Sequence, residues 1–424
     1  MKLETKNPNY CATVVRIHNL IPLNGLDNLV GFPCFGNMAL LSKDHTVGEL
    51  GVLFTAETKL SDKFCVENNL YRDKELNKDK TKTGYVDSGR IKPLKLRGNI
   101  STALFMPLSS LSCFGVNPED FKEGQTFTHI NDEEICCKYV IFQPGEKKKN
   151  KQKGEKKKRV YVDCNVFKEH IDTQFFLRNL KEFQPNDWIV VTEKIHSTSG
   201  RFGHIKVDRD LKWHEKLAKW FGVKVQEQQY RTVCGSRRVV KIDGSEQSFY
   251  KTDVWSETLQ KIAHLIPKDV MIYGEIVGWA GDKPLQKDYT YQMPPHTTEL
   301  YVYRIATVNE NGFMVDWSWN QIKDFCSKTG IKHVPEIYQG FFKDFDYKVF
   351  EDKKFREELG LTQCLPLDNE APCSEGLVVR LDNGLTPFFT KFKSPQFYLH
   401  EGCQITAGTV DIETEESVTD DENS

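Results

Sequence analysis

The 424-residue sequence predicts an α+β protein, in which an all-β N-terminal barrel precedes a larger domain of mixed strands and helices. Three observations predict this. Short β-type runs separated by Gly and Pro fill the first 144 residues, and helical periodicity is scarce there. Runs typical of strands and of helices alternate over residues 160–410. A lysine-rich segment without apolar residues separates the two. At roughly 100–200 residues per domain, the length agrees with two or three domains.

The N-terminal runs are Ala12–Ile17, Gly51–Phe54 and Thr102–Met106. They predict strands of a small barrel within residues 1–144. Four basic residues precede the third run: Arg90, Lys92, Lys95 and Arg97. Such residues suit a surface that binds a nucleic-acid backbone, but they suit an ordinary charged edge strand equally well.

Two charged segments divide the rest of the chain. Residues 145–159 hold nine Lys or Arg and two Glu, which predicts a solvated linker or a flexible basic arm that follows phosphates. Residues 411–424 hold seven Asp or Glu and no Lys or Arg, which predicts a disordered acidic tail. We therefore expect a barrel over 1–144, a linker or loop over 145–159, a second domain over 160–410 and a tail over 411–424.

Composition restricts the cellular setting. The net charge of −2 excludes a histone-like polycation. The N-terminus lacks the apolar core of a signal peptide, and no stretch approaches the ~18 apolar residues of a membrane span. The 12 cysteines contain no CxxC pattern and indicate reduced thiols. We expect an intracellular monomer, in the cytoplasm or in an organelle, without a membrane partner.

In the second domain, Asp208–Trp220 and Ser256–Leu265 are predicted to be helices. The predicted strands are Met271–Trp279, Leu300–Val308, Gly376–Leu381 and Phe388–Phe392. Another apolar run, Trp188–Val191, leads directly into Lys194 and then into a turn of small polar residues. A lysine at a strand end beside such a turn is placed to act as a nucleophile.

Six segments with residues suited to catalysis follow one another in this domain. They are Lys194-Ile195-His196, Gly235-Ser236-Arg237-Arg238, Ile272-Tyr273-Gly274-Glu275-Ile276-Val277-Gly278, Tyr301-Val302-Tyr303, Ser374-Glu375-Gly376 and Lys391-Phe392-Lys393. Strand alternation puts the outer two residues of the first, fourth and sixth segments on one face. A lysine nucleophile must be neutral, and burial beside positive charge favours the neutral amine.

The order of these segments resembles the covalent nucleotidyltransferase superfamily, which contains ATP-dependent DNA and RNA ligases and mRNA capping enzymes. Lys-x-His-x-Thr preceded by Glu193 resembles the RNA-ligase form of the nucleophile motif. Arg97-Gly98-Asn99 followed by Leu104–Leu108 resembles the OB-like domain that precedes the catalytic domain in RNA ligases joining 3′-OH and 5′-phosphate ends. The resemblance implies a nucleotidyltransferase domain of antiparallel sheets with flanking helices. It also implies an ATP-dependent RNA ligase that uses Mg²⁺ or Mn²⁺ and acts on RNA, as a nicked duplex or an RNA/DNA hybrid.

The resemblance also implies residue roles. Lys194 would be the nucleophile that accepts AMP, His196 would act in the second step, and Lys391 and Lys393 would contact the α-phosphate. The residues implied in ATP or AMP binding, besides these two lysines, are Glu193, Arg201, Arg237, Glu275, Tyr301, Tyr303 and Glu375. Glu375 and Glu275 would hold the metal. The residues implied in RNA binding are Lys95, Arg97 and Arg238.

Two departures and three alternatives stand beside this interpretation. Ser197 occupies a position where the family usually has Gly, and its Cβ would narrow the approach of phosphates or alter the turn. Lys241-Ile242-Asp243-Gly244 matches the DNA-ligase form of the motif, but the order of the other segments favours Lys194. The alternative functions are a capping guanylyltransferase, a DNA ligase, and a non-catalytic OB-fold nucleic-acid-binding protein with a decayed ligase domain.

Overall fold

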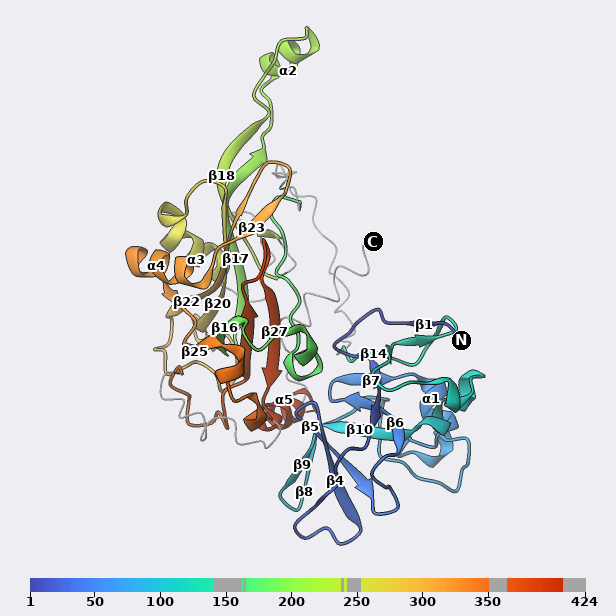
Figure 1. Ribbon diagram of the computed structural model, residues 1–424. Helices are drawn as coiled ribbons and strands as arrows, with labels where there is room; N and C mark the ends of the chain where they lie inside the picture. Colours follow the sequence, from blue (N-terminus) through green and yellow to red (C-terminus); the bar gives the residue numbers. More distant parts are fainter. Residues whose placement is uncertain (141–161, 163–164, 238–239, 242–252, 351–363, 407–424) are drawn as a thin grey trace.

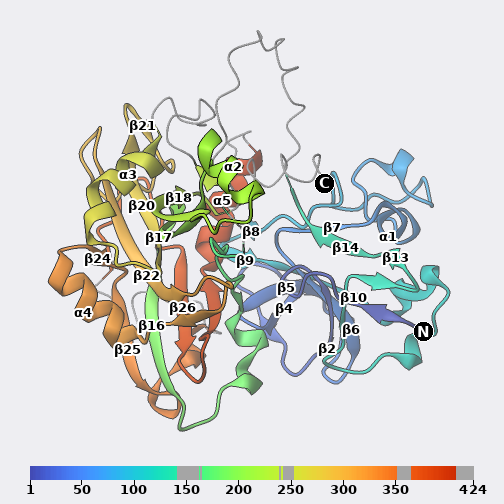
Figure 2. The same ribbon diagram turned by 90° about the horizontal axis from the view of Figure 1, so that it is seen from above.

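The computed structural model describes residues 1–140, 162, 165–237, 240–241, 253–350 and 364–406 (Figure 1). We call residues 1–140 the N-terminal region and residues 165–406 the C-terminal region. They lie side by side, with the last helix, α5 (Pro395–Thr406), at their junction in both views (Figures 1 and 2). The predicted basic linker, the acidic tail and the proposed domain boundaries all lie outside the described residues, so the division into domains stays a prediction.

The N-terminal region is built on a seven-stranded sheet. In spatial order its strands are β11 (Thr126–Phe127), β2 (Ala12–Arg16), β6 (Leu50–Thr55), β10 (Ala103–Pro107), β5 (Asn37–Ser42), β4 (Leu29–Cys34) and β3 (Ile21–Pro22). Successive side chains of a strand point to opposite faces. Leu53 and Phe54 of β6 therefore enter two different hydrophobic clusters, one on each side of the sheet.

Short strand pairs and one helix complete this region. They are β1 (Leu3–Glu4) with β12 (His129–Ile130) and β13 (Glu133–Glu134), β7 (Thr58–Leu60) with β14 (Cys136–Lys138), β8 (Leu94–Leu96) with β9 (Asn99–Ser101), and α1 (Asp62–Glu67). Arg97 and Gly98 form the two-residue turn of β8–β9, and both have positive φ angles, 47° and 87°. This is the left-handed backbone that tight hairpin turns require, which explains the Gly.

Two sheets form the C-terminal region. The first contains β18 (Gln228–Gly235), β17 (Thr198–Asp208), β20 (Val270–Ala280) and β22 (Thr298–Val308), with the short strands β19 (Val240–Lys241), β21 (Lys283–Pro284), β23 (Met314–Asp316) and β24 (Lys332–His333) at its edges. The second has the order β15 (Gln174–Phe175), β27 (Phe388–Lys393), β26 (Gly376–Leu381), β16 (Trp188–Lys194) and β25 (Glu336–Phe341). The mixed, largely antiparallel architecture confirms the predicted α+β class.

Two further helices, α3 (Val254–Ile262) and α4 (Trp319–Thr329), flank these sheets, and α2 (Trp213–Trp220) lies between β17 and β18. Trp255, Leu259 and Ile262 of α3 point into the core because the spacing i, i+4, i+7 keeps them on one face. The prediction of a helix from Asp208 was wrong in its first turn: β17 continues to Asp208, which pairs with Gln228, and the helix begins at Trp213. Among the described residues, no helix combines the length and the hydropathy needed to cross a bilayer.

Candidate active site

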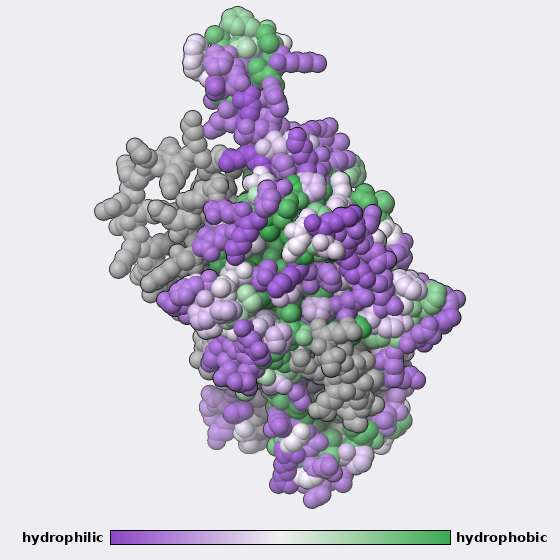
Figure 3. Space-filling view, turned by 90° about the vertical axis from the view of Figure 1, so that its left-hand side faces the viewer, coloured by the Kyte–Doolittle hydropathy of each residue, from purple (hydrophilic) through white to green (hydrophobic). Residues whose placement is uncertain are grey.

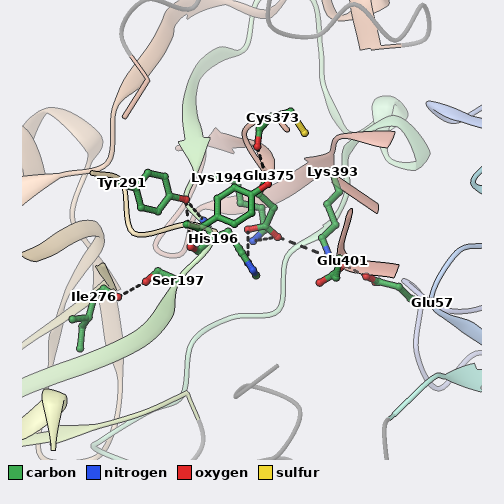
Figure 4. A network of polar contacts seen from close by, with 11 residues as sticks. Glu57, Lys194, His196, Ser197, Ile276, Tyr291, Cys373, Glu375, Lys393 and Glu401 are labelled. Carbon is green, nitrogen blue, oxygen red and sulfur yellow. Dashed lines mark hydrogen bonds and ion pairs between the residues drawn. The ribbon is translucent and has the colours of Figure 1, made fainter. Parts of the chain in front are cut away.

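A cavity lies between the two regions, and both contribute side chains to it. Its lining includes the ends of β16, β26 and β27 and the middle of β20. From the predicted site it brings together Glu193, Lys194, His196, Arg237, Glu275, Tyr303, Glu375, Lys391 and Lys393. Figure 4 shows the polar contacts that connect several of these side chains.

Lys194 ends β16 and pairs with Gly376 of β26. A Cβ at position 376 would lie 1.9 Å from the carbonyl oxygen of Phe392, so only Gly lets β26 and β27 approach here. The preceding residue, Glu375, is buried, and its Oε1 lies 2.7 Å from Lys194 Nζ. Burial lowers the pKa of Lys194, but the charge and hydrogen bond of Glu375 outweigh burial and raise it above the ordinary value. The expectation that its surroundings lower the pKa of Lys194 is therefore wrong for the protein alone, in which this lysine is protonated.

Lys391 and Lys393 lie two residues apart on β27 and face the same cavity. Burial, and then the charges of Lys194 and Lys393, lower the pKa of Lys391 to about 8. In the part of the chain that the structure describes, Lys391 forms no ion pair; its Nζ lies 5.4 Å from the ring centroid of Phe175. Lys391 is thus a half-buried cation that forms no ion pair with these residues, as expected of a group that binds an anionic ligand.

Lys393, by contrast, is surrounded by carboxylates. Its Nζ lies 2.9 Å from Glu57 Oε1, 2.7 Å from Glu401 Oε2 and 4.0 Å from Glu375 Oε1. Burial lowers the pKa of Lys393, but these acids together raise it well above the ordinary value. Glu57 belongs to the turn between β6 and β7, so this ion pair joins the N-terminal region to the catalytic strand (Figure 4).

Glu57 and Glu401 respond in opposite directions to the same lysine. Burial raises the pKa of Glu57, but Lys393 more than offsets this and holds the pKa below its usual range. Burial and the neighbouring charge of Glu57 raise the pKa of Glu401 well above its usual range. Tyr10 Oη donates a hydrogen bond to Glu57 Oε2 at 3.0 Å. The cluster thus favours a charged Glu57 and a neutral Glu401.

The turn after Lys194 is fixed by two hydrogen bonds. The backbone N–H of His196 donates to the hydroxyl of Tyr291 at 2.7 Å, and Ser197 Oγ donates to the carbonyl of Ile276. The His196 ring packs edge-on against aromatic rings and places Nδ1 3.8 Å from Glu375 Oε2. Lys194 and His196 therefore approach the same carboxylate, in agreement with their predicted common face. Ser197 points toward β20 and is buried, so it anchors the turn to the strand that carries Glu275.

Only one of the two predicted tyrosines, Tyr303, lies in the cavity. Tyr303 lines the cavity, and its hydroxyl lies 3.2 Å from Ser199 Oγ. Tyr301 is not among the described residues that line the cavity. It packs in the core, and Lys332 Nζ lies 5.6 Å from the centroid of its ring. The cause is a bulge: Tyr273 pairs with Arg304 but Gly274 pairs with Val302, which leaves Tyr303 as an extra residue. A bulge breaks the alternation on which the sequence argument depended.

The predicted nucleotide-binding acids and arginines differ in placement. Glu193 is buried at the cavity, where it accepts hydrogen bonds from Ser374 Oγ at 2.9 Å and from the backbone N–H of Leu365 at 2.8 Å. Glu275 and Arg237 also line the cavity. Arg201 does not belong to the described cavity lining. It is buried, donates to the carbonyl of Phe167 at 2.8 Å and packs on that ring.

The predicted RNA-binding residues lie elsewhere or outside the description. Lys95 and Arg97 are exposed on the β8–β9 hairpin, where Arg97 Nη1 donates to the carbonyl of Gly25 at 2.6 Å. Arg238 lies outside the described residues. Of the rival nucleophile motif, the structure describes only the backbone of Lys241, which pairs with Cys234 at the sheet edge.

Several cavity residues were missed by the sequence argument. The N-terminal region supplies Tyr10, Glu57, Arg90, Lys138 and Tyr139, and the C-terminal region adds His170 and Glu401. Arg90 is buried, and its guanidinium lies 4.8 Å from the ring centroid of Tyr139. The sequence predicts Arg90 for a basic surface or a charged edge strand and not for a cavity, and no local pattern marks the other residues. Glu57 has a positive φ of 67°, a conformation that its sequence does not announce.

The carboxylates fit a site for a divalent cation that binds together with phosphates. The described residues contain no group of three or more His, Cys, Asp or Glu side chains able to hold a metal alone. Mg²⁺ is commonly held by one or two carboxylates, with waters and substrate phosphates completing its shell. Buried Glu375 and half-buried Glu275, on the same cavity, match that requirement.

Comparisons with known proteins agree with this geometry. The sequence model of the family described as RNA ligase matches residues 187–393, from β16 to the end of β27. Residues 187–393 thus match the RNA ligase family. This family implies an RNA substrate. A comparison with curated protein sequences found no match.

Solved structures of an RNA ligase share the fold over nearly the whole chain. A variant of the Naegleria gruberi enzyme with ATP and Mn has a TM-score of 0.55 at 13% identity and covers 93% of this chain and 99% of its own. The same enzyme with PPi has a TM-score of 0.55 at 14% identity, covering 92% and 98%. An apo variant gives 0.55 at 13%, covering 92% and 98%.

Proposed function

We propose that this RNA ligase uses ATP to adenylylate Lys194, transfers AMP to an RNA 5′-phosphate and joins that end to a 3′-OH. One observation carries the proposal: Lys194, Glu375, Lys391 and Lys393 meet in a single cavity although they come from three strands. ATP and Mn accompany the Naegleria gruberi enzyme of the same fold, which supports the choice of nucleotide and metal.

In the first step, the neutral Nζ of Lys194 attacks the α-phosphorus of ATP. A P–N bond forms, the bond to the bridging oxygen breaks, and pyrophosphate leaves with that electron pair. Lys391 and Lys393 lie where they can offset charge on the phosphoryl oxygens, which is the dominant catalytic demand in phosphoryl transfer. Of the two predicted tyrosines, Tyr303 is the one that lines the cavity, and it is proposed to pack on adenine.

Lys194 must lose a proton before it attacks, and Glu375 opposes that loss. Mg²⁺ or Mn²⁺ held by Glu375 and Glu275 would supply positive charge that favours both the neutral amine and the departing pyrophosphate. His196 is proposed to act in the second step, and Arg237 to hold the RNA phosphate or the pyrophosphate. We further propose a monomeric intracellular enzyme that acts on nicked duplex RNA or an RNA/DNA hybrid. The cysteines of the described residues are all free thiols, which supports an intracellular site.

Incubation with α-labelled ATP or GTP and Mg²⁺ or Mn²⁺, followed by a denaturing gel, tests the proposal. Label retained from ATP is expected. Label from GTP alone would indicate a capping enzyme, and no label from either nucleotide would indicate a binding protein. Sealing of nicked RNA and nicked DNA substrates then separates an RNA ligase from a DNA ligase.

A further inference from the structure

The hairpin β17–β18 carries an exposed aromatic helix at its tip. The helix α2 connects the two strands and projects beyond the rest of the C-terminal region (Figure 1). In the space-filling view the projecting tip shows hydrophobic residues beside hydrophilic ones (Figure 3). None of the eight residues of α2 is buried, and Trp213 and Trp220 are each 77% exposed.

The exposed apolar residues share one face of α2. At about 100° per residue, Trp220 lies about 20° to one side of Trp213, while Leu217 and Phe221 lie about 40° and 80° to the other side. Phe221 is 68% exposed, and its ring contacts that of Trp220. Large exposed aromatic patches on a soluble surface commonly mark a binding site.

Lysines border only one edge of this face. Lys216 lies about 60° from Trp213 on the Trp220 side, and Lys212 precedes the helix on that side. The opposite border is formed by His214 and Ala218. Two acids near the tip are already paired, Glu215 with Arg209 at 2.7 Å and Glu227 with Lys219 at 2.7 Å, whereas the exposed Asp208 and Asp210 lie before the helix. Within the described part of the chain, Lys212, Lys216 and Lys224 form no ion pair, so the tip offers unpaired positive charge beside aromatic rings.

We propose that the tip of the β17–β18 hairpin binds single-stranded RNA that flanks the ends being joined, with bases on Trp213 and Trp220 and phosphates on Lys212 and Lys216. The proposal rests on the proposed RNA-ligase function and adds a substrate class to it. Aromatic rings beside a row of cations are how proteins bind unpaired RNA, whereas duplex RNA keeps its bases stacked inside. An amphipathic helix lying on a membrane would carry lysines along both borders of its apolar face.

The strand β17 sets the distance between the tip and the cavity. Ser199 lines the cavity, and Asp208 ends the strand at the tip. These nine residue steps span about 30 Å at about 3.4 Å per residue. That distance corresponds to roughly nine stacked nucleotides at about 3.4 Å each. A single-stranded extension shorter than this should therefore not reach α2.

The test compares RNA binding by the wild-type protein and by Trp213→Ala/Trp220→Ala. Nicked RNA duplexes would be blunt, or would have unpaired 3- or 15-nucleotide extensions that begin beside the base pairs at the nick, and fluorescence anisotropy would report affinity. We expect the double variant to lose about tenfold in affinity for the long extension, as expected for one or two stacked bases, and less than twofold for the other duplexes. Lys216→Glu should weaken binding of the long extension and lower its salt dependence. Phe313→Ala, at another exposed aromatic residue, is the matched control and should change nothing.

Labelling of the protein by α-labelled ATP separates this proposal from the function on which it rests. The tip variants should form the AMP adduct at the wild-type rate, because α2 lies away from the cavity. Equal affinity of wild type and double variant for every RNA, with the adduct still formed, would overturn the proposal and leave the ligase function intact. Failure of wild type to form an adduct would overturn the ligase function, while the binding comparison would still report on the tip. An effect of the double variant confined to anionic vesicles or to self-association would assign the surface to a membrane or to a second copy and overturn the RNA proposal.

Discussion

The cavity has two walls of different origin. The C-terminal wall comprises Lys194, Glu375 and Lys391, held by neighbouring strands of one sheet. The N-terminal wall includes Tyr10 and Glu57, which come from the other region of the molecule. The C-terminal wall carries the groups proposed to react with ATP. The N-terminal wall adjusts the charge of that site from outside the catalytic sheet.

Two lysines of β27 show what this difference does. Lys391 faces positive neighbours and has a pKa lowered by burial and by those charges, to about 8. Lys393, two residues away, has a pKa that Glu401, Glu57 and Glu375 raise in spite of burial. Identical residues on one strand face therefore differ because, in the described part of the chain, only Lys393 forms ion pairs with carboxylates, one from the N-terminal wall (Glu57) and one from α5 (Glu401).

Removing the nucleophile should have the largest effect. Lys194→Ala removes the only atom proposed to bond to AMP, so we expect no labelled adduct after incubation with α-labelled ATP. Lys241→Ala is the matched control and should keep wild-type labelling. Loss of label only in Lys241→Ala would move the nucleophile to the other motif.

Glu375→Gln should come next, with a loss of about 10²–10³-fold in the rate of adduct formation. Two effects oppose each other in this variant. The amide no longer raises the pKa of Lys194, which favours attack, but it also removes a carboxylate proposed to hold the divalent cation. We expect the second effect to win because electrostatic stabilisation is commonly the larger catalytic contribution. Single-turnover rates at several Mn²⁺ concentrations measure it, and a faster variant would show that Glu375 mainly restrains Lys194.

Lys194 and Glu375 could be predicted from the sequence because the nucleophile motif and the strand that follows Glu375 are local patterns in a fixed order. Strand alternation also placed Lys194 with His196 and Lys391 with Lys393 correctly. It failed for Tyr301 and Tyr303, because a bulge depends on the register with the neighbouring strand. The helix predicted from Asp208 began too early, because Asp208 pairs with Gln228 and belongs to β17.

The N-terminal wall could not be predicted from the sequence. Glu57 and Lys393 are 336 positions apart, and no motif connects them. Their contact depends on how the two regions pack and on a left-handed backbone at Glu57. Charge alone does not distinguish Glu57 from the other acids, because the chain contains 60 Asp and Glu residues. Position in space, and not residue type, makes it part of the site.

The pH dependence of ATP binding should report on Lys391. Its lowered pKa means that Lys391 is charged below pH 8 and loses its proton as pH rises through about 8. ATP affinity should therefore fall above pH 8, by up to about tenfold per pH unit where one proton is linked to binding. Calorimetry with a non-hydrolysable ATP analogue from pH 7 to 10 measures this. Lys391→Arg, which stays charged, should flatten the profile; a flat wild-type profile would contradict the assignment.

A smaller effect is expected from neutralising the N-terminal wall. Glu57→Gln keeps the shape of the side chain and removes a negative charge from the cavity. At roughly 10 Å and an effective dielectric of about 20, one charge contributes about 1.7 kcal/mol, so ATP affinity should rise by up to about twentyfold. The second acid that forms an ion pair with Lys393, Glu401, provides the control.

Glu401→Gln is that control. The raised pKa of Glu401 favours its neutral form, so the amide should change ATP affinity by less than twofold. Equilibrium binding at pH 7 compares the two variants. A large effect of Glu401→Gln with little effect of Glu57→Gln would place the negative charge on the C-terminal residue and reverse our account of the cluster.

The smallest catalytic effect should come from Ser197, which occupies the position where glycine was expected. The hydroxyl donates to the carbonyl of Ile276 and points toward β20, so it ties the turn after Lys194 to the strand of Glu275. Ser197→Ala should lower the free energy of unfolding by about 1 kcal/mol through the lost hydrogen bond. Ser197→Gly should lower it by about 0.5–1 kcal/mol more, because Gly has greater freedom in the unfolded chain.

Adduct formation should change by less than threefold in both Ser197 variants. Denaturant unfolding and single-turnover labelling measure the two quantities separately. A tenfold faster Ser197→Gly enzyme would instead revive the sequence-based hypothesis that a Cβ here narrows the approach of phosphates. The direction of the Ser197 side chain favours the first outcome, because an atom that anchors the turn to β20 supports the C-terminal wall from behind and leaves the reacting groups in place.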